Sequence, residues 1–114
     1  MKVYNSSKNN IIADKADIAQ NPFTRIVGLL LKKSVSENEG LVINPCNSVH
    51  TFFMRFPIDV LFVNKRNEII ACYENVKPWR ILPIHLRSNY VVELCAGEIS
   101  SKNIQKGDVI SISN

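Results

Sequence analysis

The apolar residues of this chain fall in short runs that are separated by turn-forming residues. Runs of this length that are rich in β-branched and aromatic residues are typical of β-strands. The polar residues 5–10 predict a hairpin between the first two runs, and Asn64–Lys65–Arg66–Asn67 predicts another turn. The predicted strands are Val3–Tyr4, Ile11–Ala13, Leu41–Ile43, His50–Phe56, Val60–Val63, Ile69–Tyr73, Tyr90–Leu94 and Val109–Ile112.

A helix signal stands out near the N-terminus. Asn21 is a favourable N-cap residue, Pro22 suits the first helical position, and Gly28 can end a helix in the left-handed conformation. We predict one short helix over about residues 22–31. Residues 77–86 carry two prolines, which cannot donate to a sheet, so we predict a loop that crosses the surface there. The fold class we expect is mainly β, a small partly closed barrel or sandwich with this helix over one opening.

The length of the chain sets the number of domains. Its 114 residues fit one domain, over 1–114, and leave no room for a separate cofactor or substrate domain. With 46% hydrophobic residues, a chain of this size can bury a core without a metal ion or a disulfide. Disorder is therefore not expected.

The charge pattern argues against a nucleic-acid partner. The net charge is 14 − 10 = +4, and all of the excess lies in the first 33 residues, while residues 34–114 hold eight cations and eight acids. Nucleic-acid binders instead cluster their cations in a stripe that neutralises several phosphates together. The excess here is diffuse, so we expect no nucleic-acid binding.

The cysteines and the apolar runs bear on the cellular location of the protein. Cys46, Cys72 and Cys95 are odd in number and form no Cys-x-x-Cys pair, which argues against a disulfide framework and a zinc ribbon. The longest apolar run, Ile26–Leu31, is broken by Gly28 and is too short for a membrane span. We therefore expect a cytoplasmic protein with no membrane partner.

A series of ordered blocks carries a family resemblance. The blocks are Gly28–Leu29–Leu30, Glu39–Gly40–Leu41, His50–Phe62, Pro78–Trp79–Arg80, Val92–Glu93–Leu94, Ala96–Gly97 and Ile104-x-x-Gly107–Asp108–Val109. In order and spacing they resemble the family catalogued as domain of unknown function 192, over about residues 16–112. The resemblance implies a small, mostly β domain of bacteria and archaea, with one short helix near its start and no established activity.

Two blocks depart from the more common family pattern. The family's Phe-Trp-Met-Lys-Asn is Phe52–Phe53–Met54–Arg55–Phe56 here, and its Gly-Leu-Met is Gly28–Leu29–Leu30. An aromatic pair, a methionine and a cation are retained. The side-chain amide is lost at Phe56, which removes a polar group that a general model of the family's site would use.

Charged residues inside the most apolar part of the chain mark a candidate site. His50, Arg55 and Asp59 lie within ten residues. On a strand, alternation places His50 and Arg55 on opposite faces, but a bend at Pro57 could turn Asp59 toward either. Because an unpaired buried charge is costly, Arg55 and Asp59 could simply form an ion pair. The other interpretation is a polar pocket in which Arg55 and Arg80 bind an anionic group.

Other chemistries have weaker signals. The spacing of Cys46 and His50 suits two metal ligands, but the remaining ligands would have to come from distant strands. A nucleophilic Cys46 would need its pKa lowered by a neighbour, and nothing in its flanking residues requires this. The four glycines are isolated, so no phosphate-binding glycine loop is present, and no Gly-x-Ser-x-Gly motif occurs.

These observations favour a binding or accessory module with a pocket for a small anionic ligand. The expected site comprises His50, Arg55, Asp59, Trp79, Arg80 and Glu93, with no cofactor and no metal. Two alternatives stay open. One is a small enzyme that uses Asp59 or His50 as a general base. The other is a protein interaction module, monomeric or weakly dimeric, that pairs through a strand edge or through the apolar face around Phe52 and Phe53.

Overall fold

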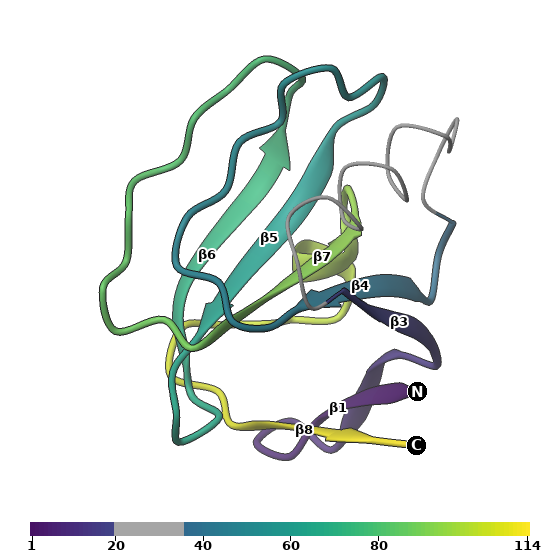
Figure 1. Ribbon diagram of the computed structural model, residues 1–114. Coiled ribbons are helices and arrows are strands. Elements are labelled where there is room, and N and C mark those ends of the chain that lie inside the picture. Colours follow the sequence, from purple (N-terminus) through teal and green to yellow (C-terminus); the bar gives the residue numbers. More distant parts are fainter. Residues whose placement is uncertain (20–35) are drawn as a thin grey trace.

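The computed structural model describes residues 1–19 and 36–114, and the strands of this part form two sheets (Figure 1). The smaller sheet joins the two ends of the chain. Its order is β2-β1-β8, and both pairings are antiparallel. Its strands are β1 (Lys2–Asn5), β2 (Asn10–Ala13) and β8 (Ile110–Ser113).

The larger sheet has five strands in the order β3-β4-β7-β5-β6. Every pairing in it is antiparallel except that of β3 with β4. The strand β6 therefore lies at one edge. The strands are β3 (Lys15–Ala19), β4 (Glu39–Ile43), β5 (Ile58–Val63), β6 (Ile69–Val76) and β7 (Tyr90–Cys95), and the short helix α2 (Glu98–Ser101) follows β7.

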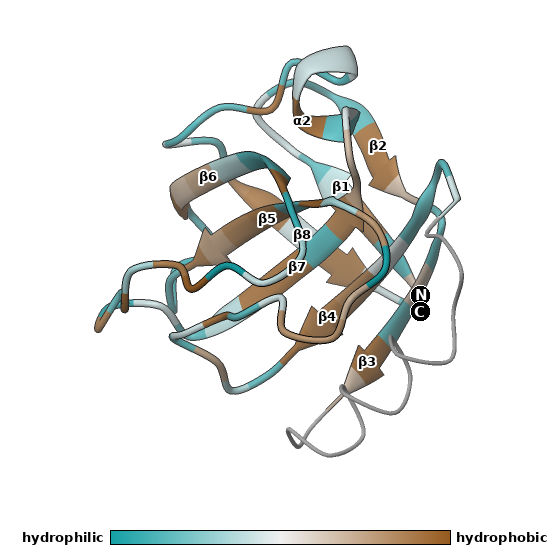
Figure 2. Ribbon diagram, turned by 90° about the horizontal axis from the view of Figure 1, so that it is seen from above, coloured by the Kyte–Doolittle hydropathy of each residue, from teal (hydrophilic) through white to brown (hydrophobic). Residues whose placement is uncertain are grey.

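Apolar residues pack on both faces of the larger sheet, as the brown central strands of Figure 2 indicate. The first core joins the two sheets, and Val92 and Leu94 of β7 contribute to it. The second core lies on the other face and contains Val60 and Phe62 of β5. Because both faces are buried, β5 is a continuous apolar run in which only Asp59 is charged.

Two irregular segments cover the second core, and both run beside β5 and β6 in Figure 1. One is the 44–57 segment. The other, residues 77–89, is named the covering loop below. Backbone bonds join the two, including Leu82 N–H to Val49 O at 3.0 Å and His85 N–H to Asn47 O at 2.9 Å. The two segments therefore form one layer over the sheet.

Most of the predicted strands are confirmed, and so is the mainly β class. The described strands form two sheets rather than a closed barrel. The loop predicted over residues 77–86 is also confirmed. The predicted helix over 22–31 lies outside the described residues, and the structure adds α2, which the sequence argument did not predict.

The predicted strand His50–Phe56 is wrong. These residues form a looped segment whose single ladder contact is a bridge between His50 and Ile81. Phe53 has φ of +67°, which a strand cannot contain. The alternation argument that placed His50 and Arg55 on opposite faces therefore does not apply. Within the described chain, no helix is long and apolar enough to cross a membrane.

Candidate functional site

Asp59 serves the fold as a buried anchor. It lies on β5, is fully buried, and accepts three backbone N–H bonds. One oxygen binds Asn75 N at 2.8 Å, and the other binds Gly97 N at 3.1 Å and Ile99 N at 2.9 Å. The helix α2 begins after Gly97, which has no side chain to cap it. Asp59 supplies that cap from a distant strand.

Glu93 points to the opposite face of the sheet. It stands directly across from Val60 in the pairing of β5 with β7, and directly opposed residues share a face. Val60 belongs to the second core. Asp59, the neighbour of Val60 along β5, therefore faces the other way. The two acids of the predicted site do not come together.

Arg55 does not pair with Asp59. Arg55 is exposed, whereas Asp59 is fully buried. Within residues 1–19 and 36–114, the ion pairs join Lys8 to Asp108 and Lys102 to Glu98. The ion pair that the spacing of Arg55 and Asp59 suggested is therefore not formed.

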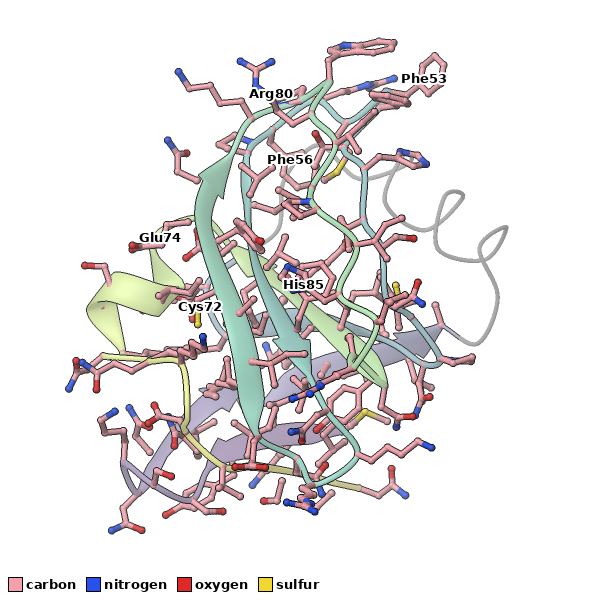
Figure 3. All side chains as sticks on the ribbon, turned by 90° about the vertical axis from the view of Figure 1, so that its left-hand side faces the viewer. Phe53, Phe56, Cys72, Glu74, Arg80 and His85 are labelled. Atoms are coloured by element: carbon pink, nitrogen blue, oxygen red, sulfur yellow. The ribbon has the colours of Figure 1, made fainter. Side chains whose placement is uncertain are left out.

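Aromatic rings gather at one end of the covering loop. The ring centroids of His50 and Phe52 are 4.8 Å apart, and those of Phe52 and Trp79 are 5.8 Å apart. Phe53 meets Trp79 edge to face at 4.8 Å. Arg80, which follows Trp79, lies at the same end of the molecule as Phe53 (Figure 3). Of the predicted site residues, His50, Trp79 and Arg80 are thus brought together.

Thr51 holds this end in place. Its hydroxyl donates to Lys77 O at 2.6 Å and accepts from Arg80 N at 2.9 Å. Its backbone N–H donates to Arg80 O at 2.9 Å, and its carbonyl accepts from Trp79 N at 3.0 Å and Met54 N at 3.2 Å. Because Thr51 is fully buried, these bonds are shielded from water. One buried threonine therefore fixes the two segments to each other.

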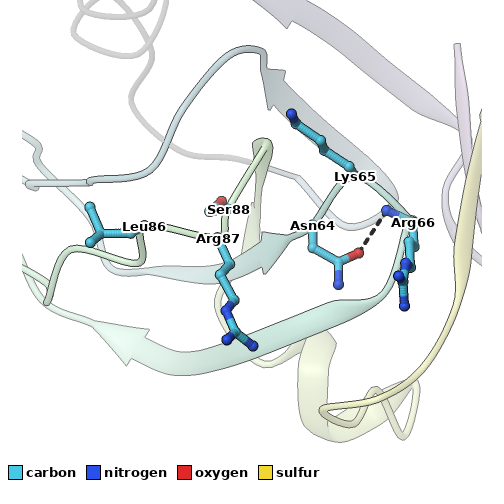
Figure 4. A pocket seen from close by; sticks show the side chains of 6 residues that line it. All are labelled: Asn64, Lys65, Arg66, Leu86, Arg87 and Ser88. Atoms are coloured by element: carbon cyan, nitrogen blue, oxygen red, sulfur yellow. Dashed lines mark hydrogen bonds between the residues drawn. The ribbon is translucent and has the colours of Figure 1, made fainter.

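A pocket with basic side chains lies at the other end of the covering loop (Figure 4). Its volume is about 470 Å³. None of its lining residues is acidic, and none belongs to the site predicted from the sequence. We call it the basic pocket, and its lining residues are Asn64, Lys65, Arg66, Leu86, Arg87 and Ser88.

Local hydrogen bonds shape the basic pocket. The side-chain oxygen of Asn64 accepts from Arg66 N at 2.9 Å and from Glu68 N at 3.0 Å, which closes the turn between β5 and β6. Asn89 N–H donates to Val63 O at 2.7 Å. This bond holds the end of the covering loop beside the turn, so cationic residues from two distant parts of the sequence line one pocket.

A second pocket adjoins the first and shares Leu86 and Arg87 with it. It adds apolar surface from Ile70 and Ile84. It also contains His85, whose ring Nε2 lies 2.7 Å from the hydroxyl of Tyr73. The pair of pockets can therefore offer cations to a charged group and apolar side chains to its neighbour.

Two of the three cysteines, Cys72 and Cys95, have environments that oppose nucleophilic chemistry. All three are free thiols. Burial, and then the carboxylates of Asp108, Glu74 and Asp59, raises the pKa of Cys72 to about 11. Burial likewise raises the pKa of Cys95. The described residues contain no group of three or more His, Cys, Asp or Glu side chains that could hold a metal ion, so Cys46 and His50 gain no further ligands there.

Sequence relatives come from archaea. A UPF0127 protein of Pyrococcus horikoshii is 32% identical over 114 residues, which cover 95% of this chain and 96% of that protein. A UPF0127 protein of Thermococcus sibiricus is 32% identical over 112 residues, covering 93% of this chain and 71% of that protein.

A solved structure and a family model agree with these relatives. A protein of unknown function from Novosphingobium aromaticivorans superposes with a TM-score of 0.82 at 19% identity, covering 97% of this chain and 82% of that one. At this identity the likeness shows the shared fold. The model of DUF192, described as "Uncharacterized ACR, COG1430", matches residues 3–112. The chain therefore belongs to the DUF192 family.

Proposed function

We propose that this protein is a binding module for a small anionic ligand and that the basic pocket is its site. The observation that carries the proposal is that Lys65, Arg66 and Arg87 line one pocket that has no acidic lining residue. None of the three forms an ion pair with a described carboxylate. Their charges are therefore available to a ligand.

The chemistry of the lining indicates a phosphate-bearing or carboxylate-bearing ligand. Guanidinium groups bind such groups in two places at once, which fixes orientation as well as charge. The volume of about 470 Å³ is in the range of small-molecule sites. Leu86 and Ile84 supply apolar surface for the rest of the ligand. A phosphate joined to a small apolar group fits this combination best.

This proposal agrees with the class of function predicted from the sequence, a binding module for a small anionic ligand. The residues proposed to bind that ligand differ from the six that were predicted. Asp59 cannot act as a general base on a ligand, because it is fully buried and both of its oxygens already accept backbone N–H bonds. His50, Trp79 and Arg80 lie at the other end of the covering loop. The pocket contains none of the six residues of the predicted site.

Calorimetric titration with phenyl phosphate and with inorganic phosphate tests the proposal. We expect both to bind, and phenyl phosphate more tightly because its ring can contact Leu86 and Ile84. The variant K65Q/R66Q/R87Q should bind phenyl phosphate at least about 10-fold more weakly, since the loss of even one charge-assisted bond costs about 1.5–3 kcal/mol.

The matched control is R55Q/R80Q, which removes cations at the other end of the covering loop. It should bind phenyl phosphate as the wild type does. Equal weakening in both variants would mean that the anion responds only to overall charge, and would overturn the assignment of the pocket. Equal affinity for the two probes would remove the apolar part of the proposal.

A further inference from the structure

Three large apolar side chains are exposed at the aromatic end of the covering loop. The exposed fractions are 63% for Phe53, 58% for Trp79 and 73% for Ile81. These three residues, named the aromatic tip below, are joined by the contact of Phe53 with Trp79 and by the bridge of Ile81 to the 44–57 segment. An apolar patch of this kind on a small protein commonly marks an interaction surface.

The fold holds the two aromatic residues of the tip in a disfavoured backbone conformation. Phe53 has φ of +67° and Trp79 has φ of +66°, a region that bulky L-residues rarely adopt. The bonds of buried Thr51 to Trp79 N and Met54 N fix both turns. Conformational strain that is retained by surrounding bonds is a feature of functional surfaces. Here it keeps large apolar rings directed outward.

The charges around the tip are of one sign. Arg55, Lys77 and Arg80 are exposed, and residues 50–58 and 77–89 contain no Asp or Glu. None of the three cations forms an ion pair with a described carboxylate. A partner that fits this surface therefore carries negative charge next to apolar material.

The shape of the tip distinguishes between such partners. Phe53 and Arg80 project at one extremity of the molecule in Figure 3, whereas the basic pocket lies at the far end of the covering loop. A projecting group of apolar side chains can insert into the interfacial region of a lipid bilayer. Aromatic rings that prefer the boundary between water and hydrocarbon, flanked by cations, match the interface of an anionic bilayer.

We propose that the aromatic tip docks this protein on the surface of a membrane that contains anionic lipids. Phe53, Trp79 and Ile81 enter the interfacial region, and Arg55, Lys77 and Arg80 contact the lipid headgroups. Docking of this kind requires no membrane-spanning segment. It differs from the expectation of no membrane partner, which rested on the lack of a long apolar run, and it does not depend on the basic pocket.

Trp79 is the single tryptophan of the chain, so its fluorescence reports on the tip directly. Vesicles of phosphatidylcholine mixed with phosphatidylglycerol should shift its emission to shorter wavelength and carry the protein into the pellet on sedimentation. Vesicles of phosphatidylcholine alone should bind about 100-fold more weakly, because three cation–headgroup contacts are lost and each is worth about five-fold.

Two variants locate the contact. Phe53→Asn suits the left-handed conformation and should fold at least as stably as the wild type while binding anionic vesicles about tenfold or more weakly. R55Q/R80Q should lose about 25-fold. The variant K65Q/R66Q/R87Q, which removes three cations at the other end of the covering loop, should keep the emission shift of Trp79.

Several results would overturn the proposal. The first is an unchanged Trp79 emission and no sedimentation with anionic vesicles. The second is vesicle binding that survives both tip variants and disappears in K65Q/R66Q/R87Q, which would assign it to the basic pocket. The third is an equal emission shift with soluble polyglutamate, which would identify an acidic protein surface as the partner. None of these results alters the binding of phenyl phosphate, so this proposal and the pocket proposal fail separately.

Discussion

At the scale of single residues, burial decides which charged groups are available for function. Asp59 drew attention in the sequence because an acid within an apolar run is unusual. The structure shows that its three bonds to backbone N–H groups account for that position. Sequence alone could not separate these roles, because a buried anchor and a catalytic acid both appear as a charge among hydrophobic neighbours.

The role of Asp59 can be tested by substitution. Asp59→Ala leaves three backbone N–H groups without an acceptor, so we expect the free energy of unfolding to fall by about 3 kcal/mol or more. Asp59→Asn keeps one acceptor oxygen and should lose less. Urea denaturation measures both. Wild-type stability in the alanine variant would contradict the anchor role, and a folded Asp59→Asn protein that no longer binds phenyl phosphate would point to a direct role at a ligand site.

At the scale of elements, a strand could be predicted where the local sequence determines the backbone. It could not be predicted where bonds to a distant segment determine it. The strands β5, β6 and β7 were predicted because each contains a short run rich in β-branched and aromatic residues. The run His50–Phe56 has a similar composition but forms a loop, since its backbone is fixed by Thr51 across to residues 77–80. Such a long-range bond leaves no signal in the local pattern.

Thr51 therefore makes the side-chain bonds that join the 44–57 segment to the covering loop at its aromatic end. Thr51→Val removes the hydroxyl that donates to Lys77 O and accepts from Arg80 N. We expect the free energy of unfolding to fall by about 1–3 kcal/mol, because two polar groups lose their partner. Hydrogen exchange at the backbone N–H of Arg80 should become faster. Thr51→Ser, which keeps the hydroxyl, is the control.

If Thr51→Val left both the stability and the exchange of Arg80 N–H unchanged, the hydroxyl bonds would not hold the layer. If Thr51→Ser lowered stability as much as Thr51→Val, the loss in Thr51→Val could not be assigned to the hydroxyl bonds. We expect Thr51→Val to lower the free energy of unfolding more than Thr51→Ser does. We also expect it to speed hydrogen exchange in the covering loop more than in the rest of the protein. Vesicle binding should weaken in Thr51→Val, since the tip then loses its fixed orientation.

At the scale of the whole molecule, folding separates charges that are balanced along the sequence. Residues 44–67 and 77–89 hold six cations and one acid, the buried Asp59. Their cations are Arg55, Lys65, Arg66, Lys77, Arg80 and Arg87. Counting residues 34–114 together gave an even balance, which hid this basic layer. The mainly β class could be predicted, whereas the site could not, because it depends on which loops share a face.

The two ends of the chain are also joined, through Asp108. Its carboxylate accepts from Lys8 Nζ at 2.9 Å, Asn5 Nδ2 at 2.9 Å and Gln105 N at 3.0 Å. Burial opposes the ionised form, but the hydrogen bonds from Asn5, Lys8 and Gln105 outweigh it and lower the pKa of Asp108 below its ordinary value of 3.8. The turn after β1 is thus tied to the turn before β8 by one ionised group.

This lowered pKa predicts a loss of stability in acid. Because the folded state holds the proton of Asp108 less tightly than the unfolded state, the contribution is fully present above pH 3.8 and is lost as the pH falls through the folded pKa. We expect the urea midpoint of the wild type to fall more steeply than that of Asp108→Asn below about pH 4, and the variant to be less stable near neutral pH. If the urea midpoints of the two proteins changed with pH in parallel, the ionisation of Asp108 would not contribute to the loss of stability in acid. Convergence of the curves in acid would show that this single carboxylate couples the two ends of the chain to the stability of both sheets.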